Sequence, residues 1–448
     1  MQRPPGLIYA LDETPPPAVL FLLAVQHIFL MSSSLVLPVV LVGEIGGSFE
    51  EARSVVAFTM IACGIGTALQ ALRLRRFGGL GSGYLCPNLC GPNFFAASME
   101  AAWLGGLPLM RGMTIVAGLF EAVFARVVHR LAFLFPPEIT GLVVFMVGEG
   151  LVPLGTSKFL GINFEGEPIQ GAFVGVAVAT LLTMIGVNAF GRGKLRLYGV
   201  LVGMGVGYVL SIAAGILSAS DLERLARSPW FALPALPHQW SFAFRWSILP
   251  TFLIVSITGA LKSMGNLILC EKSNDAEWKG ADMDRIGTGL MADAACVTVS
   301  GLLGGMASDT SASNVSLSVA TGATSRKIGY AAAALFAFLG LSPKISGVLT
   351  VMPMPVMGSI LLFVTIFMLV SGLQMIVGSG MDPRKTLVVG VSLAFGLSID
   401  VIPVLWAGVP GWLQPLFGSS LTLATVMAVV LNQLLARAGR PAAAGAAK

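Results

Sequence analysis

Long apolar runs separated by short polar connectors set the pattern of this chain. An α-helix needs about 20 mainly apolar residues to cross the hydrocarbon core of a bilayer. The pattern therefore predicts an all-α polytopic membrane protein with about 14 transmembrane segments. Their approximate positions are 18–42, 54–72, 83–103, 107–129, 138–155, 170–190, 197–217, 247–270, 287–306, 312–323, 328–351, 354–378, 385–403 and 417–436.

Two of these segments, the third and the tenth, are poor membrane helices. The third carries the sequence GSGYLCPNLCGPNF at 81–94, and the tenth follows SDTS at 308–311 and begins with Ser313 and Asn314. Their backbone groups would lack hydrogen-bond partners in lipid, so we expect these segments inside the protein. Interruptions at corresponding places in two halves indicate a repeat with a binding site at the midplane. Because each half has an odd number of spans, the repeat is expected to be inverted.

The chain is accordingly divided into two sevens. We predict a cytoplasmic N-terminal segment at 1–17, a first repeat at 18–217, a connector at 218–246, a second repeat at 247–436 and a cytoplasmic tail at 437–448. With the N-terminus in the cytoplasm, 19 of the 27 Lys and Arg residues fall on the cytoplasmic side, seven on the other side, and one within a span. This bias predicts that both termini are cytoplasmic.

Composition removes most other classes of protein. Hydrophobic residues make up 55% of the chain and charged residues 11%, against about 25% charged residues in soluble proteins. A soluble enzyme, a disordered chain, a coiled coil and a disulfide scaffold are excluded. The net charge of +5 is spread over short loops without an arginine-rich arm, so no nucleic-acid partner is expected.

Ionisable side chains inside the predicted spans are costly and therefore point to function or to a buried pairing. They are His27, Glu121, Glu149, Lys262, Asp293 and Asp309, of which Glu121, near a helix end, is expected to reach the membrane interface. For His27, which follows Gln26, an interhelical hydrogen bond and a contact with solute or proton both fit. Asp309 fits either a helix cap or a functional group. Lys262 lies too deep to reach the membrane surface easily, which favours function. Asp293 is expected to support the site, with Lys262 as an available partner.

Four places in the chain carry a resemblance to a known family. They are Tyr9, Leu11-Asp12 and Pro15-Pro16 ahead of Gln26-His27; Lys262 with Gly265; Gly289 to Asp293; and Ser313-Asn314-Val315-Ser316 through Thr321-Gly322. In these motifs and their spacing the chain resembles the nucleobase–ascorbate transporters, also called xanthine/uracil permeases.

The resemblance implies fourteen spans in two inverted sevens, split into a core and a gate domain, with short strands in spans three and ten. It also implies a homodimer in the bacterial inner membrane that carries uracil, xanthine, urate or a related base, usually with protons. By the match, the substrate-binding residues are Asn93, Phe94, Lys262, Ser313 and Asn314. Coupling or supporting roles are expected for Gln26, His27, Glu149, Asn266, Asp293 and Thr321.

This chain departs from the family pattern at the expected site. Lys262 stands where the family usually has Glu, Asn266 where it has Asp, Ser313 where it has Gln or Glu, and Ser316 where it has Gly. Lysine reverses the charge, which favours an anionic or readily deprotonated heterocycle such as urate, xanthine or a carboxylated pyrimidine over a neutral base. Three states of Lys262 fit the sequence: paired with a buried acid, charged and awaiting an anion, or neutral when the site is empty.

Two other functions compete with this interpretation. An anion transporter or channel-like permease of the same architecture would use Lys262 and the N-termini of two half-helices. A membrane-embedded enzyme is disfavoured, because the sequence offers no nucleophile–base pair and no metal-ligand set. No cofactor and no metal are therefore expected.

Overall fold

The computed structural model describes residues 3–74, 79–131, 134–162, 168–234, 240–378, 380–406, 408–410, 417 and 419–438. The first half of the chain contains α1 (Pro17–Ser32), η1 (Ser33–Leu35), α2 (Val36–Glu44), α3 (Phe49–Ala71), β1 (Asn88–Cys90), η2 (Pro92–Phe94), α4 (Phe95–Leu131), α5 (Pro137–Leu160), α6 (Gly171–Phe190), η4 (Gly193–Tyr198), α7 (Gly199–Ala213) and α8 (Ala219–Arg227).

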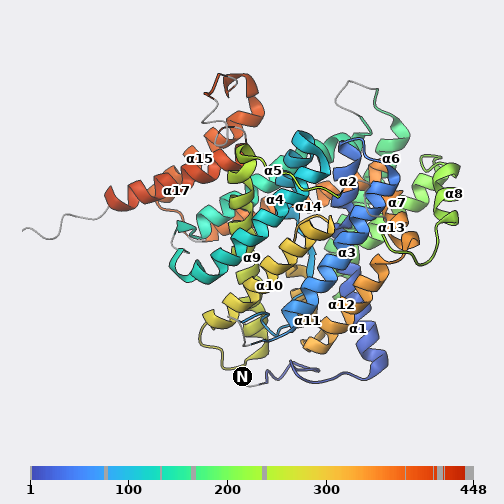
Figure 1. The fold of residues 1–448 in the computed structure, drawn as a ribbon, viewed down its shortest axis with the longest axis horizontal. Coiled ribbons are helices and arrows are strands. Elements are labelled where there is room, and N and C mark those ends of the chain that lie inside the picture. The colour runs from blue at the N-terminus through green and yellow to red at the C-terminus, as the bar shows by residue number, and fades with distance from the viewer. Residues whose placement is uncertain are drawn as a thin grey trace, which may run out of the picture.

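The second half also contains long helices on both sides of one short strand; its helices are labelled in Figure 1. It contains η5 (Trp246–Ile248), α9 (Leu249–Asn274), α10 (Met283–Leu303), β2 (Ser308–Thr310), α11 (Ala312–Thr321), α12 (Arg326–Gly340), α13 (Pro343–Thr350), α14 (Met354–Gly378), α15 (Pro383–Val401), η6 (Pro403–Trp406) and α17 (Ser420–Ala438). The expected C-terminal tail at 437–448 lies, from residue 439 on, outside the described residues.

The described part of the chain contains eight helices that are long and apolar enough to cross a membrane. The count becomes nine if α12 and α13, which meet at an angle of 79°, form one bent span. Shorter apolar helices, α7 and part of α17, fall within two further predicted stretches. The protein is thus a mostly helical, multi-pass membrane protein, as its apolar pattern predicts.

Helix ends follow from local sequence. Serine or aspartate side chains cap the first turns of α3, α8, α10, α11, α12 and α15 by accepting hydrogen bonds from backbone N–H groups, which satisfies donors that have no partner inside the helix. Glycines in the left-handed conformation end α5, α10 and α11. α4 joins the predicted third and fourth spans, and non-helical backbone at Gly105 and Gly106 marks their boundary.

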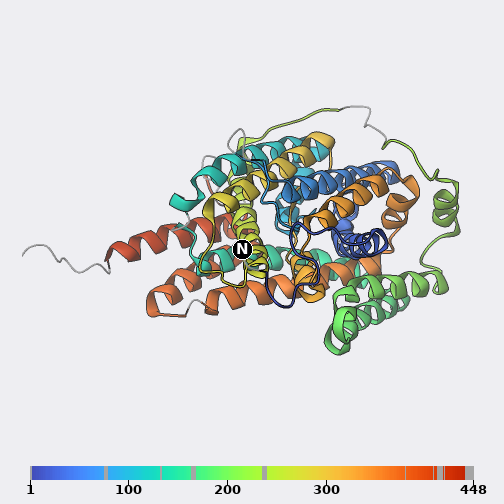
Figure 2. The same cartoon turned by 90° about the horizontal axis from the view of Figure 1, so that it is seen from below.

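The long helices pack in two groups. The first helix group contains α1, α3, α4, α9, α10 and α12, in which α4 packs on α10, α3 on α12, and α4 on α9. The second helix group contains α5, α6, α7, α14, α15 and α17, in which α5 packs on α14, α6 on α7, and α15 on α17. The pairs α6–α7 and α15–α17 lie toward opposite ends of the molecule's long axis (Figures 1 and 2).

The two strands lie in the two interrupted segments, as the sequence analysis expected. They pair antiparallel, with Asn88 opposite Thr310, Leu89 opposite Asp309, and Cys90 opposite Ser308. All three residues of β2 are buried. The pairing satisfies part of the backbone of these segments inside the protein, which is the condition for non-helical chain at membrane depth.

Close contact between α5 and α14 depends on two glycines, and we predict that filling one of them destabilises the protein. A Cβ at Gly372 would lie 2.6 Å from the backbone nitrogen of Phe145 and 2.7 Å from the carbonyl oxygen of Gly141. We expect Gly372→Ala to cost about 1–3 kcal/mol because the helices must move apart. The melting temperature of the detergent-purified protein measures this.

Gly186→Ala in α6 is the matched control, because a Cβ there meets nothing within 4 Å. Alanine also has the higher helix propensity, by up to about 1 kcal/mol. A Gly372→Ala melting temperature equal to that of Gly186→Ala would contradict the close contact.

Candidate functional site

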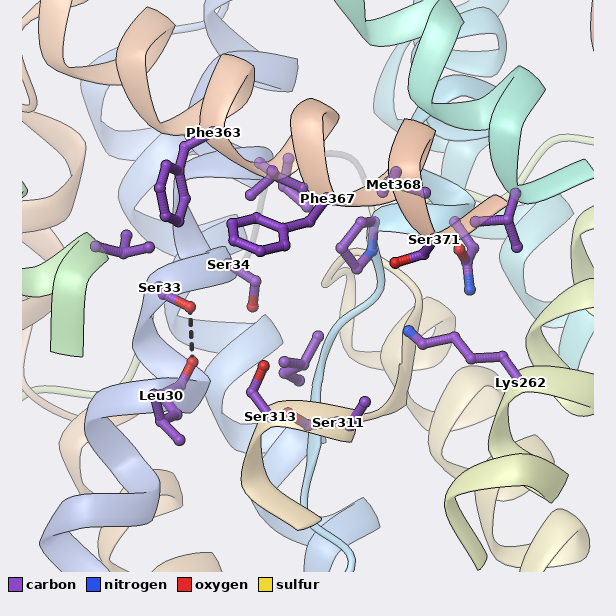
Figure 3. A pocket seen from close by; sticks show the side chains of 18 of the residues that line it. Leu30, Ser33, Ser34, Lys262, Ser311, Ser313, Phe363, Phe367, Met368 and Ser371 are labelled. Atoms are coloured by element: carbon purple, nitrogen blue, oxygen red, sulfur yellow. Dashed lines mark hydrogen bonds between the residues drawn. The ribbon is translucent and has the colours of Figure 1, made fainter. Parts of the chain in front are cut away.

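A cavity of about 730 Å³ lies between the first helix group and the second. Its walls come from α1, η1 and α2, from the starts of η2 and α11, and from α9 on one side; the facing wall comes from α5, α7 and α14. In Figure 3, Phe363, Phe367, Met368 and Ser371 of α14 face Ser313 at the start of α11, and Lys262 points into the space between them. This volume falls within the usual range for small-molecule sites, about 300–1,000 Å³.

Interrupted backbone brings polar groups to the cavity wall. β2 ends one residue before Ser311, whose side chain caps α11, so that the first turn of α11 and Ser313 border the cavity. The N–H groups of a first helical turn lack partners within the helix and carry the positive end of its dipole. The break between α1 and α2 also puts Ser33 and Ser34 on the wall, where each hydroxyl donates to a carbonyl of the preceding turn.

Lys262 is anchored by a buried acid. Its Nζ donates to Oδ2 of Asp309 at 2.9 Å, and the Nδ2 of Asn93 donates to the same oxygen at 2.8 Å. The Lys262 side chain is 28% exposed and that of Asp309 is 1% exposed. A buried carboxylate is tolerated when it is paired and hydrogen-bonded. Of the three states that fit the sequence, the structure therefore has Lys262 in an ion pair, with one face of its ammonium group toward the cavity.

Asp293 is not the partner of Lys262, which corrects the expectation from sequence. Its Oδ1 accepts from Asn88 Nδ2 at 2.6 Å, and its Oδ2 accepts from the Ser263 hydroxyl. The Thr310 hydroxyl in turn donates to Ser263 at 2.8 Å, and Asn266 Nδ2 donates to Thr310 Oγ1 at 2.9 Å. These two donors, Asn88 and Ser263, stabilise the Asp293 carboxylate, which therefore does not need Lys262 as a partner.

His27 supports the start of α11. Its Nδ1–H donates to Oδ1 of Asn314 at 2.8 Å, and the Asn314 amide donates to the Ser311 hydroxyl at 2.9 Å. His27 and Asn314 are both fully buried, so Asn314 holds Ser311 and does not line the cavity. Of the two alternatives for His27, the structure has the interhelical hydrogen bond. The neighbouring Gln26 has a buried Oε1 without a hydrogen-bond partner among the described residues.

The other residues expected at the site divide into two sets. Asn93, Lys262 and Ser313 line the cavity. Phe94 does not, because it is fully buried and its ring lies against Gly259 of α9. Thr321 donates its hydroxyl to the carbonyl of Leu317, inside the last turn of α11.

Glu149 lies on α5, outside the wall of the cavity. Its Oε2 is buried without a hydrogen-bond partner in the part of the chain that the structure describes.

Several residues of the cavity wall were not expected from the sequence. Arg196, Asn188, Ser371 and the rings of Phe29 and Phe367 line the cavity. Arg196 looked like one more basic loop residue, and Phe367 like one more apolar residue of a span. The run of three serines at 32–34 could have indicated that the break between α1 and α2 borders the site. Consecutive serines inside an apolar helix favour such a break, because their hydroxyls donate hydrogen bonds to backbone carbonyls.

Comparison with known proteins decides the family. The family model for xanthine/uracil permeases, described as "Permease family", matches residues 18–405. This chain belongs to that family. The xanthine permease XanQ of Escherichia coli (strain K12) is 27% identical over 451 residues, covering 96% of this chain and 94% of XanQ. The uric acid permease PucJ of Bacillus subtilis (strain 168) is 28% identical over 422 residues, covering 92% of this chain and 91% of PucJ.

Solved structures show the same fold. The transmembrane domain of the cyanobacterial bicarbonate transporter BicA matches with a TM-score of 0.52 at 15% identity, covering 91% of this chain and 97% of that chain. The murine anion transporter Slc26a9 in its inward-facing state matches with a TM-score of 0.56 at 10% identity, covering 95% of this chain and 69% of that chain. The protein is thus a permease, and not an enzyme.

The ion pair predicts energetic coupling between Lys262 and Asp309. In a double-mutant cycle of Lys262→Met and Asp309→Asn, we expect a coupling of about 0.5–3 kcal/mol, because each single change leaves the other charge without its partner. The cycle of Lys262→Met with Asp293→Asn is the matched comparison and should give the smaller coupling, because Asp293 takes its hydrogen bonds from Asn88 and Ser263 and makes none with Lys262. Unfolding free energies in detergent measure both. A larger coupling to Asp293 than to Asp309 would contradict the geometry.

Proposed function

We propose that the protein is a secondary active transporter of a nucleobase-like heterocycle across the bacterial inner membrane. The observation that carries this proposal is the cavity between the two helix groups, with Lys262 held by Asp309 and directed into it. XanQ and PucJ are named for xanthine and uric acid. Their similarity along nearly the whole chain supports a purine or a related ring as the solute.

The polar groups at the cavity wall suit the edge of a planar heterocycle. Lys262 retains donor capacity beyond its bond to Asp309, because an ammonium group has three N–H donors. Ser313 offers a hydroxyl, and Asn93 has its amide oxygen left after its nitrogen donates to Asp309. The rings of Phe29 and Phe367 supply apolar faces. A few polar groups in an otherwise apolar cavity set the orientation of a bound ligand.

Lysine at position 262 favours a deprotonated solute. A carboxylate at this place would accept a hydrogen bond from a ring N–H, whereas Lys262 donates one. A ring nitrogen that has lost its proton is an acceptor and carries negative charge. Among the described residues that line the cavity, Lys262 and Arg196 are the ionisable ones, and both are cations. We therefore propose urate, xanthine or a carboxylated pyrimidine as the solute in its anionic form, in preference to a neutral base.

Helix packing supports the proposed 7+7 inverted repeat with fourteen spans. In the proposed repeat, span two is equivalent to span nine, and span four to span eleven. α3 and α12 would be spans two and eleven, and α10 and α4 would be spans nine and four. The packed pair α3–α12 is then equivalent to the packed pair α10–α4. The pairs α6–α7 and α15–α17 correspond in the same way. β1 pairs with β2 and α5 packs on α14, and within each pair the two members occupy equivalent places of the two halves.

Alternating access is the transport mechanism that we propose for this arrangement. We propose that the first helix group, with both strands, is the core domain and that the second helix group is the gate. With both termini in the cytoplasm, α7 begins at the cytoplasmic side, so the exposed Arg196 just before it marks a cytoplasmic mouth of the cavity. A homodimer and proton coupling complete the proposal, by analogy with the family.

An anion transporter of the same fold, working without a coupling proton, is the second candidate. The two cations at the cavity wall favour it, and the fold neighbours BicA and Slc26a9 are named as bicarbonate and anion transporters. A ligand panel separates the candidates, because a specific ligand raises the melting temperature of the protein by mass action. Stabilisation by xanthine or urate supports the heterocycle, and stabilisation by bicarbonate, sulfate or chloride alone overturns it.

Lys262→Met tests the role assigned to the ammonium group. We expect urate affinity to fall about 10- to 100-fold, because a hydrogen bond to a charged group contributes about 1.5–3 kcal/mol. Lys272→Met on the same helix is the control, since Lys272 lies over the ring of Trp278 and outside the cavity wall. Calorimetric titration of both purified variants measures the affinities. Unchanged urate affinity in Lys262→Met would leave Lys262 a structural residue only.

A further inference from the structure

A buried glutamate that does not line the cavity has no role in the solute site proposed above. Glu121 of α4 is 1% exposed. Among the described residues, no N–H or O–H group donates a hydrogen bond to either of its carboxyl oxygens. The ionised form of a carboxyl group is strongly disfavoured in such surroundings. A carboxyl group kept there without a donor or a cation needs a different explanation from Asp309, which has both.

The neighbour of Glu121 is another acid. Its carboxyl group lies within hydrogen-bonding reach of Asp293 on α10. The two helices touch at backbone level one turn earlier, because a Cβ at Gly118 would lie 2.6 Å from the backbone nitrogen of Thr298. This close approach keeps the two carboxyl groups together in a dry part of the first helix group. Two carboxyl groups in such a place share one proton, because like charges at this distance cannot both persist.

Hydrogen-bond donors show which of the two acids carries the proton. Each oxygen of Asp293 accepts a hydrogen bond, one from Asn88 and one from Ser263. These donors stabilise the anionic form of Asp293, whereas Glu121 receives no comparable bond from the described residues. The arrangement therefore has the proton on Glu121, with its O–H group donating to Asp293.

Counting the charges around this pair gives the same answer. The ionisable groups that act on Glu121 from the elements packed nearby are Asp293 of α10 and Asp309 of β2, and the Cys296 thiol of α10 lies close to it as well. Lys262 on α9 is the cation of this group, and Asp309 balances it. A second full negative charge beside Asp293 would have no compensating cation among these groups. A proton bound to one of the two carboxyl groups removes this second negative charge.

The pair is connected to the cavity by hydrogen bonds. Ser263, which donates to Asp293, accepts from the hydroxyl of Thr310. Thr310 follows Asp309 in β2, and Asp309 holds Lys262. A change of charge at the acid pair therefore acts on the strand that positions the cavity's lysine.

We propose that Glu121 is the binding site of the coupling proton, with Asp293 as the carboxylate that accepts its hydrogen bond. In each cycle one H⁺ from the outer aqueous phase binds the Glu121 carboxylate and later leaves to water on the cytoplasmic side. This proposal rests on the proposed transport function. It separates the proton site from the solute site, because Glu121 lies outside the cavity wall.

The test measures protons and solute together in proteoliposomes that contain the full-length protein and an internal pH indicator. With urate and xanthine as probes, we expect the wild-type protein to move protons inward in a fixed ratio to solute. In Glu121→Gln this ratio should fall at least tenfold. Glu100→Gln is the matched control, since Glu100 lies on α4 before the break at Gly105 and Gly106, beside Thr251 of α9 and outside the acid pair. It should keep the wild-type ratio.

A second measurement does not depend on transport. The infrared spectrum of the purified protein should contain the carbonyl band of a protonated carboxylic acid, and Glu121→Gln should remove intensity from it while Glu100→Gln leaves the Glu121 component in place. Glu121→Leu is a second variant that removes a buried polar group. It should melt at or above the wild-type temperature and also lose proton movement.

The outcomes separate the two proposals. A wild-type proton-to-solute ratio in Glu121→Gln or Glu121→Leu, or transport of urate by the wild-type protein without protons, overturns the role of Glu121 and leaves the proposed solute intact. Failure of the wild-type protein to bind or move any tested heterocycle overturns the proposed function and the coupling role with it. The infrared band still decides whether Glu121 holds a proton.

Discussion

The ion pair between Lys262 and Asp309 is the interaction on which the rest of the site depends. It joins α9 to β2 at 2.9 Å, and Asn93 of η2 donates to the same carboxylate. One buried acid thus connects both interrupted segments to the helix that carries the lysine. Because the acid is buried and the lysine is partly exposed to the cavity, the pair fixes the ammonium group in position while leaving it able to donate a further hydrogen bond.

This arrangement requires non-helical backbone deep inside a membrane protein. The β1–β2 pair and the cap at Ser311 satisfy much of that backbone, and α3, α9 and α10 pack directly on the two strands. Glycines at the helix crossings make such packing possible, because small residues let membrane helices approach at backbone distance. The polar network and the tight helix packing therefore depend on each other.

The apolar pattern was enough to predict a polytopic membrane protein. The polar interruptions at 81–94 and 308–314 located the non-helical segments, and the resemblance to the family implied the strands within them. The site was less accessible from sequence. Asn93, Lys262 and Ser313 were placed at the site by the resemblance to the family, and all three line the cavity. Phe94 was misplaced because a side chain in a 3₁₀ turn can face either the cavity or the core, and nothing local decides between them.

The pairing of buried charges could not be read from the chain either. Asp293 and Lys262 lie on consecutive helices, which made them reasonable partners, yet Asp293 finds its donors on Asn88 and Ser263. Asp309, 47 residues away from Lys262 in sequence, takes the lysine. Contacts of this kind are set by the crossing of the two halves, and periodicity along one helix carries no information about them.

The central claim is that a donor at position 262 selects the deprotonated form of the solute. Calorimetric titration of the wild-type protein with xanthine over a series of pH values tests it most directly. The account predicts that the apparent affinity rises as the pH rises through the ionisation of xanthine and levels off above it. An affinity that stays constant or falls over that range would contradict the account, because the protein would then prefer the neutral ring.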